Sequence, residues 1–193
     1  KGGYIITNNH VVENASSITV TTYDGTTYDA KLVGTDKKSD IGVLKIEADN
    51  LSPATIGDSS TIQVGQTAVV IGNPLGTLGG TVTDGIISAA SRELTINNES
   101  MTLIQTNAAI NSGNSGGGLF DGNGNLIGIV NAKDSGTTSS GATIEGLGFA
   151  IPINEAMDVA QQLIASGYVT DRATIGVSLQ TLTSDYGEYP AGL

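Results

Sequence analysis

Three residue types that together can carry out acyl transfer stand far apart in this chain: His10, Asp40 and Ser115. Ser115 lies in a glycine-rich run, AINSGNSGGG, at residues 109–118. A serine hydroxyl is a weak nucleophile and needs an adjacent base to take its proton. Imidazole can do this near neutral pH, and it needs an acid that fixes its tautomer and stabilises its charged form. The chain therefore holds the parts of a nucleophilic acyl-transfer site.

Each of these residues also has an ordinary structural interpretation. A lone histidine is more often structural than catalytic, glycine-rich turns are common, and an Asp before a strand can simply form a turn. Asp36 competes with Asp40 for the role of the acid, but it lies in the polar stretch GTDKKSD, whereas Asp40 directly precedes the apolar run IGVLKI. Their joint occurrence is the stronger signal, because the order His, Asp, Ser is that of the chymotrypsin fold.

Short apolar and β-branched runs, separated by turn residues, predict the strands that must position these side chains. Asp24-Gly25 predicts a hairpin turn, and DGNGN at residues 121–125 predicts another. We expect strand, turn and strand within residues 80–94. The other predicted strands cover residues 3–9, 16–23, 26–34, 41–48, 67–76, 101–106, 116–121, 125–133 and 146–153. Strands at this spacing without intervening helices favour an antiparallel sandwich or barrels.

One segment, NEAMDVAQQLIASG at residues 154–167, has the pattern of a helix. Asn154 is its predicted N-cap and Gly167 its predicted stop. Its expected apolar stripe consists of Met157, Ala160, Leu163 and Ile164. A new pattern follows, so we place a linker near residues 166–172 and the start of a second domain after it.

Composition excludes several classes of function. A formal net charge of −11 argues against a nucleic-acid binder and against a polybasic membrane-surface protein. The absence of cysteine excludes disulfides and a thiol nucleophile, and a single histidine excludes a His-rich metal site. We therefore expect no metal and no cofactor. No stretch reaches the length of a transmembrane helix, and because the chain begins at Lys1 without Met we expect it to be a fragment.

Four motifs carry a family resemblance. GYIITNNHVVENA, SDIGVLKIEA, GNSGGGLF and GLGFAIPI resemble the HtrA/DegP family of trypsin-like serine proteases, over about residues 3–166. The resemblance implies an all-β, chymotrypsin-like pair of six-stranded antiparallel barrels with a C-terminal helix and with the N-terminal strand missing. It implies a protease domain at 1–168, with barrels at about 1–95 and 96–168. Residues 169–193 would be a linker and the truncated start of a PDZ domain.

The resemblance also assigns roles. His10 would be the general base, Asp40 would orient it, and Ser115 would be the nucleophile. The oxyanion hole would be built from the backbone of Gly113, Asn114 and Ser115, with glycine supplying the dihedral freedom that aims a donor. Digestive trypsin-like enzymes have Asp where this chain has Asn114, and that Asp pairs with a new N-terminal amine. Because Asn carries no charge, we expect no activation by clipping.

Alignment on the serine places Ala109 and Ile110 at the base of the primary specificity pocket. Neither residue is charged, so we expect rejection of Lys, Arg, Asp and Glu and acceptance of small aliphatic side chains. The other predicted pocket residues are Asn111, Asn131, Ala132, Gly148, Phe149 and Ala150.

The resemblance implies a serine endopeptidase of protein quality control that acts on misfolded or exposed polypeptides outside the cytoplasm, in the cell envelope. A homotrimer is implied for the full-length protein, and peptide C-termini are the implied ligands of a complete PDZ domain. Two alternatives stay open. One is a non-catalytic chaperone or scaffold on a protease fold. The other is a trypsin-like endopeptidase without a PDZ domain, which IGVSLQTLT after the helix disfavours.

Overall fold

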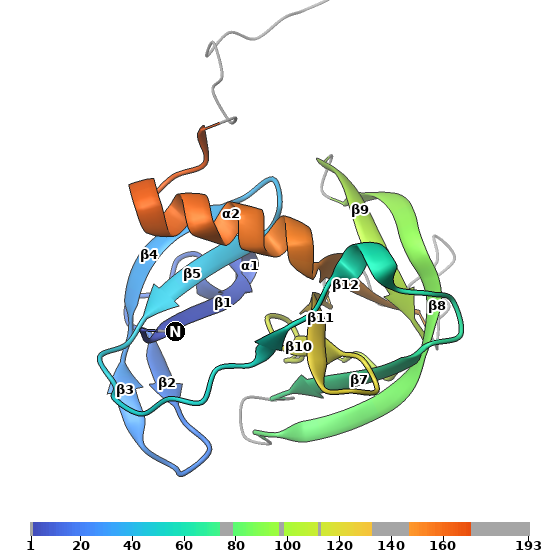
Figure 1. Cartoon of the computed structure of the whole chain (residues 1–193). Helices are drawn as coiled ribbons and strands as arrows, with labels where there is room; N and C mark the ends of the chain where they lie inside the picture. The colour runs from blue at the N-terminus through green and yellow to red at the C-terminus, as the bar shows by residue number, and fades with distance from the viewer. Residues whose placement is uncertain (1, 74–78, 97–98, 112, 133–146, 171–193) are drawn as a thin grey trace, which may run out of the picture.

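The computed structural model describes residues 2–73, 79–96, 99–111, 113–132 and 147–170. These residues form two β-rich halves, and one long helix lies against both of them (Figure 1). The predicted start of a PDZ domain falls outside the described residues. Most of the predicted strands are present, so the expectation of a mostly β, antiparallel fold is confirmed.

The first half contains five strands and a four-residue helix. They are β1 (Tyr4–Asn8), α1 (Asn9–Val12), β2 (Thr19–Thr21), β3 (Thr27–Asp29), β4 (Lys31–Asp36) and β5 (Ile41–Lys45). The strands pair in the order β1-β5-β4, and β2 and β3 form a separate hairpin around the predicted Asp24-Gly25 turn. Asn8 lies opposite Ile41 in the β1–β5 register. This register brings the residue two places after β1, His10, next to the residue just before β5, Asp40.

The second half is a closed barrel of six antiparallel strands. It contains β6 (Thr55–Ile56), η1 (Ser59–Thr61), β7 (Thr67–Gly72), β8 (Thr81–Ile96), β9 (Glu99–Thr106), β10 (Gly118–Phe120), β11 (Asn125–Asn131) and β12 (Gly148–Pro152). The strand order is β10-β7-β8-β9-β12-β11, and a β10–β11 pairing closes the ring. β6 adds to β11 in parallel.

The expected boundary between barrels near residue 95 is wrong. β7 and β8 pair with each other. The other edge of β7 pairs with β10, and the other edge of β8 pairs with β9. Both strands therefore belong to the second barrel, which begins well before residue 95. In the described residues, the first half has five strands in two sheets, and β1 pairs only with β5. The missing strand of the first barrel stays a prediction.

The predicted turn inside residues 80–94 is also wrong, because β8 runs continuously from Thr81 to Ile96. Ala68 pairs with Gly85 and Val69 with Asp84, so the Asp-Gly pair stays extended. A Cβ on Gly85 would lie 2.6 Å from the backbone nitrogen of Ala108. This glycine therefore permits a close approach of two backbones, a use that the sequence does not distinguish from a turn.

The long helix is α2 (Ile153–Ser166), and it packs on β4, β5 and β11. The predicted stop is confirmed, since Gly167 has φ of 80° and its N–H donates to the Leu163 carbonyl at 2.8 Å. The predicted cap is wrong: Pro152 is the N-cap, and the Asn154 amide instead donates to Asp58 at 2.8 Å. The stripe is confirmed only in part. Ala160 and Leu163 are buried, Met157 is half-buried and Ile164 is 39% exposed.

Candidate active site

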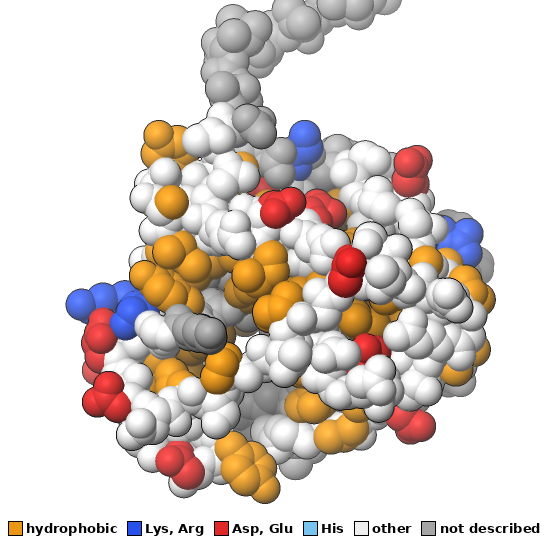
Figure 2. Space-filling view, viewed as in Figure 1, with side chains coloured by type: hydrophobic (Ala, Val, Ile, Leu, Met, Phe, Trp, Pro, Cys, Tyr) orange, Lys and Arg blue, Asp and Glu red, His pale blue; other side chains and the backbone are white. Residues whose placement is uncertain are grey.

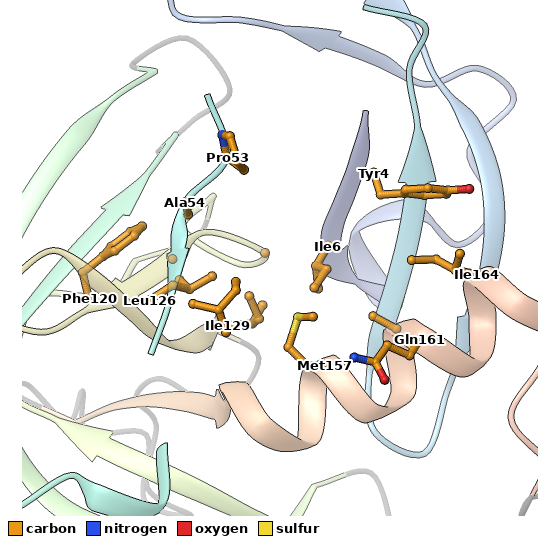
Figure 3. Close-up of a pocket in the computed structure, with 14 residues that line it drawn as sticks. Tyr4, Ile6, Pro53, Ala54, Phe120, Leu126, Ile129, Met157, Gln161 and Ile164 are labelled. Atoms are coloured by element: carbon orange, nitrogen blue, oxygen red, sulfur yellow. The ribbon is translucent and has the colours of Figure 1, made fainter. Parts of the chain in front are cut away.

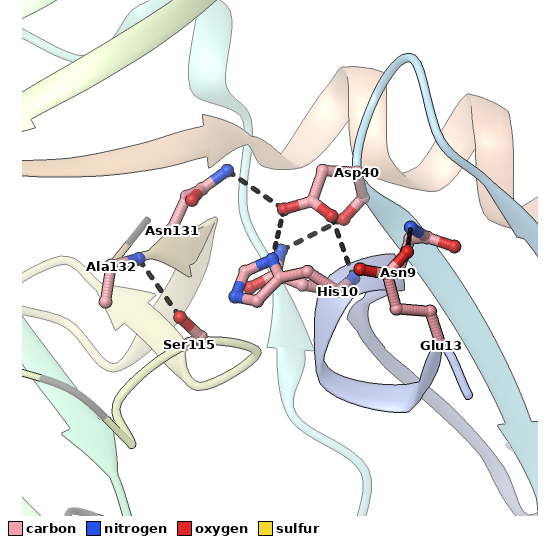
Figure 4. Close-up of polar contacts among 8 residues, drawn as sticks. Asn9, His10, Glu13, Asp40, Ser115, Asn131 and Ala132 are labelled. Atoms are coloured by element: carbon pink, nitrogen blue, oxygen red, sulfur yellow. Dashed lines mark hydrogen bonds and ion pairs between the residues drawn. The ribbon is translucent and has the colours of Figure 1, made fainter. Parts of the chain in front are cut away.

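His10 and Asp40 form a two-point contact at the end of the β1–β5 pair where β1 ends and β5 begins (Figure 4). The His10 Nδ1 and Asp40 Oδ2 atoms are 2.6 Å apart, and the backbone N–H of His10 donates to Asp40 Oδ1 at 3.0 Å. A carboxylate can only accept, so this contact places the imidazole proton on Nδ1. Nε2 is left as the basic nitrogen, which is the tautomer that a general base needs.

Asp40 is only 3% exposed and has φ of 54°, in the left-handed region. Two asparagines hold its backbone carbonyl: Asn9 donates its N–H at 3.0 Å and Asn8 its side-chain amide at 3.1 Å. These bonds fix the unusual backbone that turns the carboxylate toward His10. Sequence reasoning missed both residues, although the NN pair directly before His10 was the available signal.

Asp36, the alternative candidate for the acid, binds Ser39. Its carboxylate accepts the backbone N–H of Ser39 at 3.0 Å and the Ser39 hydroxyl at 2.6 Å. These bonds close the turn between β4 and β5, as Asp side chains often do. Asp40 is therefore the carboxylate that contacts the imidazole, as the sequence predicts.

Ser115 comes from the other half of the molecule, in the turn before β10. Its Oγ accepts the backbone N–H of Ala132 at 3.2 Å. Figure 4 shows the His10 ring lying between Asp40 and Ser115. Among the described residues, no hydrogen bond joins the Ser115 hydroxyl to His10. A hydroxyl that accepts one bond can still donate another, so the bond from Ala132 leaves the Ser115 hydroxyl able to give its proton to a base.

The turn around Ser115 has two backbone N–H groups, those of Gly113 and Ser115, that could donate to an oxyanion. The Asn114 N–H donates to the Asn111 carbonyl at 3.0 Å and so is not available to an oxyanion in this conformation. In the part of the chain that the structure describes, neither the Gly113 nor the Ser115 N–H donates to another group. Gly113 has φ of 97°, a conformation that glycine adopts at little cost. Of the three residues predicted to form the oxyanion hole, Gly113 and Ser115 therefore have an available N–H group in this conformation.

The structure brings a paired His10 and Asp40 and a serine, Ser115, to one region of a β-barrel scaffold, and comparison with known proteins names the family. Residues 1–129 match the description of a trypsin-like peptidase domain. The chain belongs to the trypsin-like peptidase family. It is 45% identical over 199 residues to the serine protease Do-like HtrA of Bacillus subtilis, and 49% identical over 183 residues to a probable periplasmic serine endoprotease, DegP-like, of Chlamydia trachomatis. The alignments cover 98% and 95% of this chain but 43% and 36% of those proteins.

Solved structures give the same answer. The HtrA-type protease AlgW with a tripeptide superposes with a TM-score of 0.78 at 46% identity, over 87% of this chain and 54% of that one. The serine endoprotease of Yersinia pestis superposes with a TM-score of 0.72 at 42% identity, over 87% and 56% of the two chains. This trypsin-like domain thus spans less than half of the two curated relatives and little more than half of these two structures.

The predicted specificity residues of the trypsin-like domain do not all lie together. Ile110 is 8% exposed and packs in the barrel core with Ala150, and its Cδ1 would lie 2.6 Å from a Cβ placed on Gly148. Phe149 points to the opposite face of β12 and joins the core beneath α2, as strand alternation requires. Ala109 and Asn111 are exposed.

Two other predicted pocket residues contact the triad candidates. Asn131 is 2% exposed and donates its side-chain amide to Asp40 Oδ2 at 3.2 Å, and Ala132 donates its N–H to Ser115. The place of Asn131 in a pocket wall stays a prediction, and its side-chain amide also binds the carboxylate of Asp40.

A separate apolar pocket of about 670 Å³ opens between β1, residues 53–56, β10, β11 and α2 (Figure 3). Figure 2 shows hydrophobic side chains gathered around a hollow beneath α2, between the two halves. The residues that line it include Ile6, Ile129 and Met157. Of the turn that holds Ser115 (residues 113–117, called the serine turn below), Gly116 alone lines this pocket. None of the predicted specificity residues lines it, so this pocket is not the predicted specificity pocket.

Neither a metal site nor a membrane span is found in the described part of the trypsin-like domain. No group of three or more His, Cys, Asp or Glu side chains there could hold a metal ion. No helix within those ranges is long and apolar enough to cross a membrane.

Proposed function

We propose that this chain carries the protease domain of an HtrA-type serine endopeptidase, with Ser115 as nucleophile, His10 as general base and Asp40 as its orienter. The observation that carries the proposal is the 2.6 Å contact between His10 Nδ1 and Asp40 Oδ2, which leaves the basic Nε2 of the ring on the side of Ser115. The nucleophile and the acid–base pair come from different halves, as they do in the chymotrypsin fold.

The reaction follows from this arrangement. The Ser115 Oγ attacks the peptide carbonyl carbon while His10 Nε2 takes the hydroxyl proton. Asp40 stabilises the imidazolium that forms, and the N–H groups of Gly113 and Ser115 meet the oxyanion. When the C–N bond breaks, His10 returns its proton to the leaving amine and an acyl-enzyme on Ser115 remains. Water, deprotonated by His10, then attacks the ester carbonyl and releases the second product and the free serine.

The substrates are exposed segments of misfolded polypeptides, and small aliphatic side chains precede the scissile bond. Support for a peptide substrate comes from AlgW, whose structures hold a tripeptide and a decapeptide. Support for the aliphatic preference is the absence of charge among Ala109, Ile110 and Gly148. A role in protein quality control outside the cytoplasm, trimer formation by the full-length protein and a PDZ domain that binds peptide C-termini complete the proposal. The word periplasmic in the name of the Chlamydia trachomatis relative supports this location.

Hydrolysis of an unfolded casein substrate tests the proposal. Ser115→Ala removes only the nucleophilic oxygen, so we expect cleavage to fall by about 10³-fold or more while the fold is retained. Ser91→Ala, at an exposed serine on β8, is the matched control and keeps wild-type activity. Cleavage that persists in Ser115→Ala overturns the proposed function. Binding of casein without cleavage by both the wild type and Ser115→Ala identifies a non-catalytic chaperone instead.

A further inference from the structure

The chain that leaves β9 toward the predicted specificity pocket stays bound to β8, its partner in the sheet (Figure 1). The pairing of the two strands ends with Ile87 opposite Thr106. Beyond it, the Thr106 hydroxyl donates to the Ile86 carbonyl at 2.8 Å, and the Asn107 side-chain oxygen accepts the Ile86 N–H at 2.8 Å. Side chains therefore hold this segment against β8 after the strand pairing has ended.

Thr83, near the start of β8, makes the next contact with the segment. Its hydroxyl donates to the Ala109 carbonyl at 2.8 Å, across 26 positions of sequence. Ala109 is the predicted base of the specificity pocket, and the following residue, Ile110, is buried in the barrel core. In the described residues, the other donor to this carbonyl is the Asn114 side-chain amide, at the longer distance of 3.5 Å. Thr83 therefore makes the closer of the two bonds that hold the Ala109 carbonyl.

We infer that Thr83 is a positioning residue for substrate selectivity, because its hydroxyl fixes the main chain at the base of the specificity pocket. The inference rests on the proposed function and deepens it, since it assigns Thr83 to the pocket of the same site. Thr83 acts through the Ala109 carbonyl and is not a catalytic residue.

A threonine suits this place because both its backbone and its side chain are constrained. Thr83 is half-buried and pairs with Val70 of β7, so the sheet fixes its main chain. A β-branched side chain has few rotamers, which fixes the direction of the hydroxyl. Two residues further along, a Cβ on Gly85 would lie 2.6 Å from the backbone nitrogen of Ala108. This close approach of the two backbones brings the Ala109 carbonyl within reach of the Thr83 hydroxyl.

Loss of the Thr83 hydroxyl should affect the pocket before it affects the chemical step. Ala109 is exposed, so its carbonyl can turn toward water when Thr83 no longer donates. The remaining donor in the described residues is Asn114, which lies in the serine turn between Gly113 and Ser115. A movement of Ala109 therefore changes the base of the pocket directly and reaches the serine turn only through the long bond from Asn114.

Hydrolysis of two peptides that differ only in having Val or Phe before the scissile bond tests the inference. Thr83→Val keeps the shape of the side chain and removes its donor. We expect the ratio of kcat/KM for the Val peptide to that for the Phe peptide to fall at least about fivefold, because a base that is no longer fixed limits the size of the pocket less strictly. We expect kcat for the Val peptide to change less than about threefold. An unchanged ratio overturns the positioning role.

Two further variants separate the lost bond from a general effect of substitution. Thr83→Ser keeps the hydroxyl, so it should retain the selectivity ratio of the wild type. Thr102→Val, at an exposed threonine on β9, is the matched control and should leave both the ratio and kcat unchanged. If Thr83→Val does not fold, as judged by circular dichroism, the comparison of Thr83→Ala with Thr83→Ser carries the test, because the two differ by a single oxygen. Equal ratios in that pair overturn the role of the hydroxyl.

Ser115→Ala, assayed in parallel, separates this inference from the proposed function. If Ser115→Ala still cleaves the peptides, the proposed function fails whatever the Thr83 variants do. If Ser115→Ala is inactive and Thr83→Val has the selectivity of the wild type, only the positioning role fails.

Discussion

Gly116, in the turn that holds Ser115, lies against Thr7 of β1, and a Cβ on Gly116 would clash with the Thr7 hydroxyl oxygen. The backbone of Gly116 also has a φ of 81°, which side chains rarely adopt. This contact joins the residue next to Ser115 to the strand that leads into His10. The two halves therefore meet at a point where a glycine allows close contact.

Gly116→Ala should lower both stability and activity. The positive φ alone costs roughly 1 kcal/mol in unfolding free energy. The clash with Thr7 adds to it, because the buried Thr7 side chain, the turn or β1 must shift, and we expect a total of about 3 kcal/mol. Because that movement separates Ser115 from His10, kcat should fall about 100-fold. Chemical denaturation and peptide hydrolysis measure the two effects.

Gly124→Ala is the control for this prediction. Gly124 has nearly the same φ, 80°, but a Cβ there would have no atom within 4 Å. It should lose roughly 1 kcal/mol and keep its activity. Equal losses of stability in the two variants would show that the contact with Thr7 has no energetic weight.

The two buried aspartates of the β4–β5 turn should separate chemistry from folding. Asp40→Asn removes the charge that stabilises the imidazolium and presents an amide to His10 Nδ1. We expect kcat to fall about 10³- to 10⁴-fold with little loss of stability. Asp36→Asn weakens the bonds to Ser39 that close the turn, so it should lower the melting temperature and leave kcat nearly unchanged. A larger loss of kcat in Asp36→Asn than in Asp40→Asn would contradict the assignment of the acid.

The sequence predicted the acid–base–nucleophile set because residue types and chain order carry that information locally. His10 is the chain's only histidine, Asp40 directly precedes an apolar run, and the motifs around both resemble those of the HtrA/DegP family. The sequence could not predict contacts between the two halves, such as the bond from Asn131 to Asp40. Asn131 was predicted only as a pocket wall, because nothing in NLIGIVNAK states which face its side chain takes once β11 meets the first half.

The prediction of a boundary between the two barrels near residue 95 was wrong for a related reason. β7 and β8 form a hairpin whose sequence fits either barrel, and only their outer pairings with β10 and β9 decide the matter. The turn predicted within residues 80–94 is absent although an Asp-Gly pair, Asp84-Gly85, usually indicates a turn. Gly85 instead allows the backbone of Ala108 to approach β8 closely. Long-range pairing and close backbone approach are the parts of the fold that local pattern leaves open.

Asp121, in the turn between β10 and β11, should make stability depend on pH. Burial raises the pKa of this carboxyl, but hydrogen bonds from the Asn125 side chain and from the backbone of Asn125, Asn123 and Gly124 outweigh it and lower the pKa below its ordinary value. A lowered folded-state pKa means stability that is present above the ordinary value near 4 and is lost as the pH falls through the folded value. Asp121→Asn should therefore be less stable than the wild type at pH 7, and the difference should shrink below pH 4. Urea unfolding at both pH values measures this, and a constant difference would contradict it.

Substrate selectivity is the last property that these residues predict. Ala109, Ile110 and Gly148 offer no charge to a substrate side chain, and Ile110 lies in the barrel core against Gly148. An ammonium group placed there would lose its hydration without gaining a partner. We therefore expect kcat/KM for a peptide with Val before the scissile bond to exceed that for the Lys peptide at least about tenfold. Ser115→Ala should lose both activities, which shows that one site is being measured. A Lys peptide that is cleaved as well as the Val peptide would place the specificity pocket elsewhere on the domain.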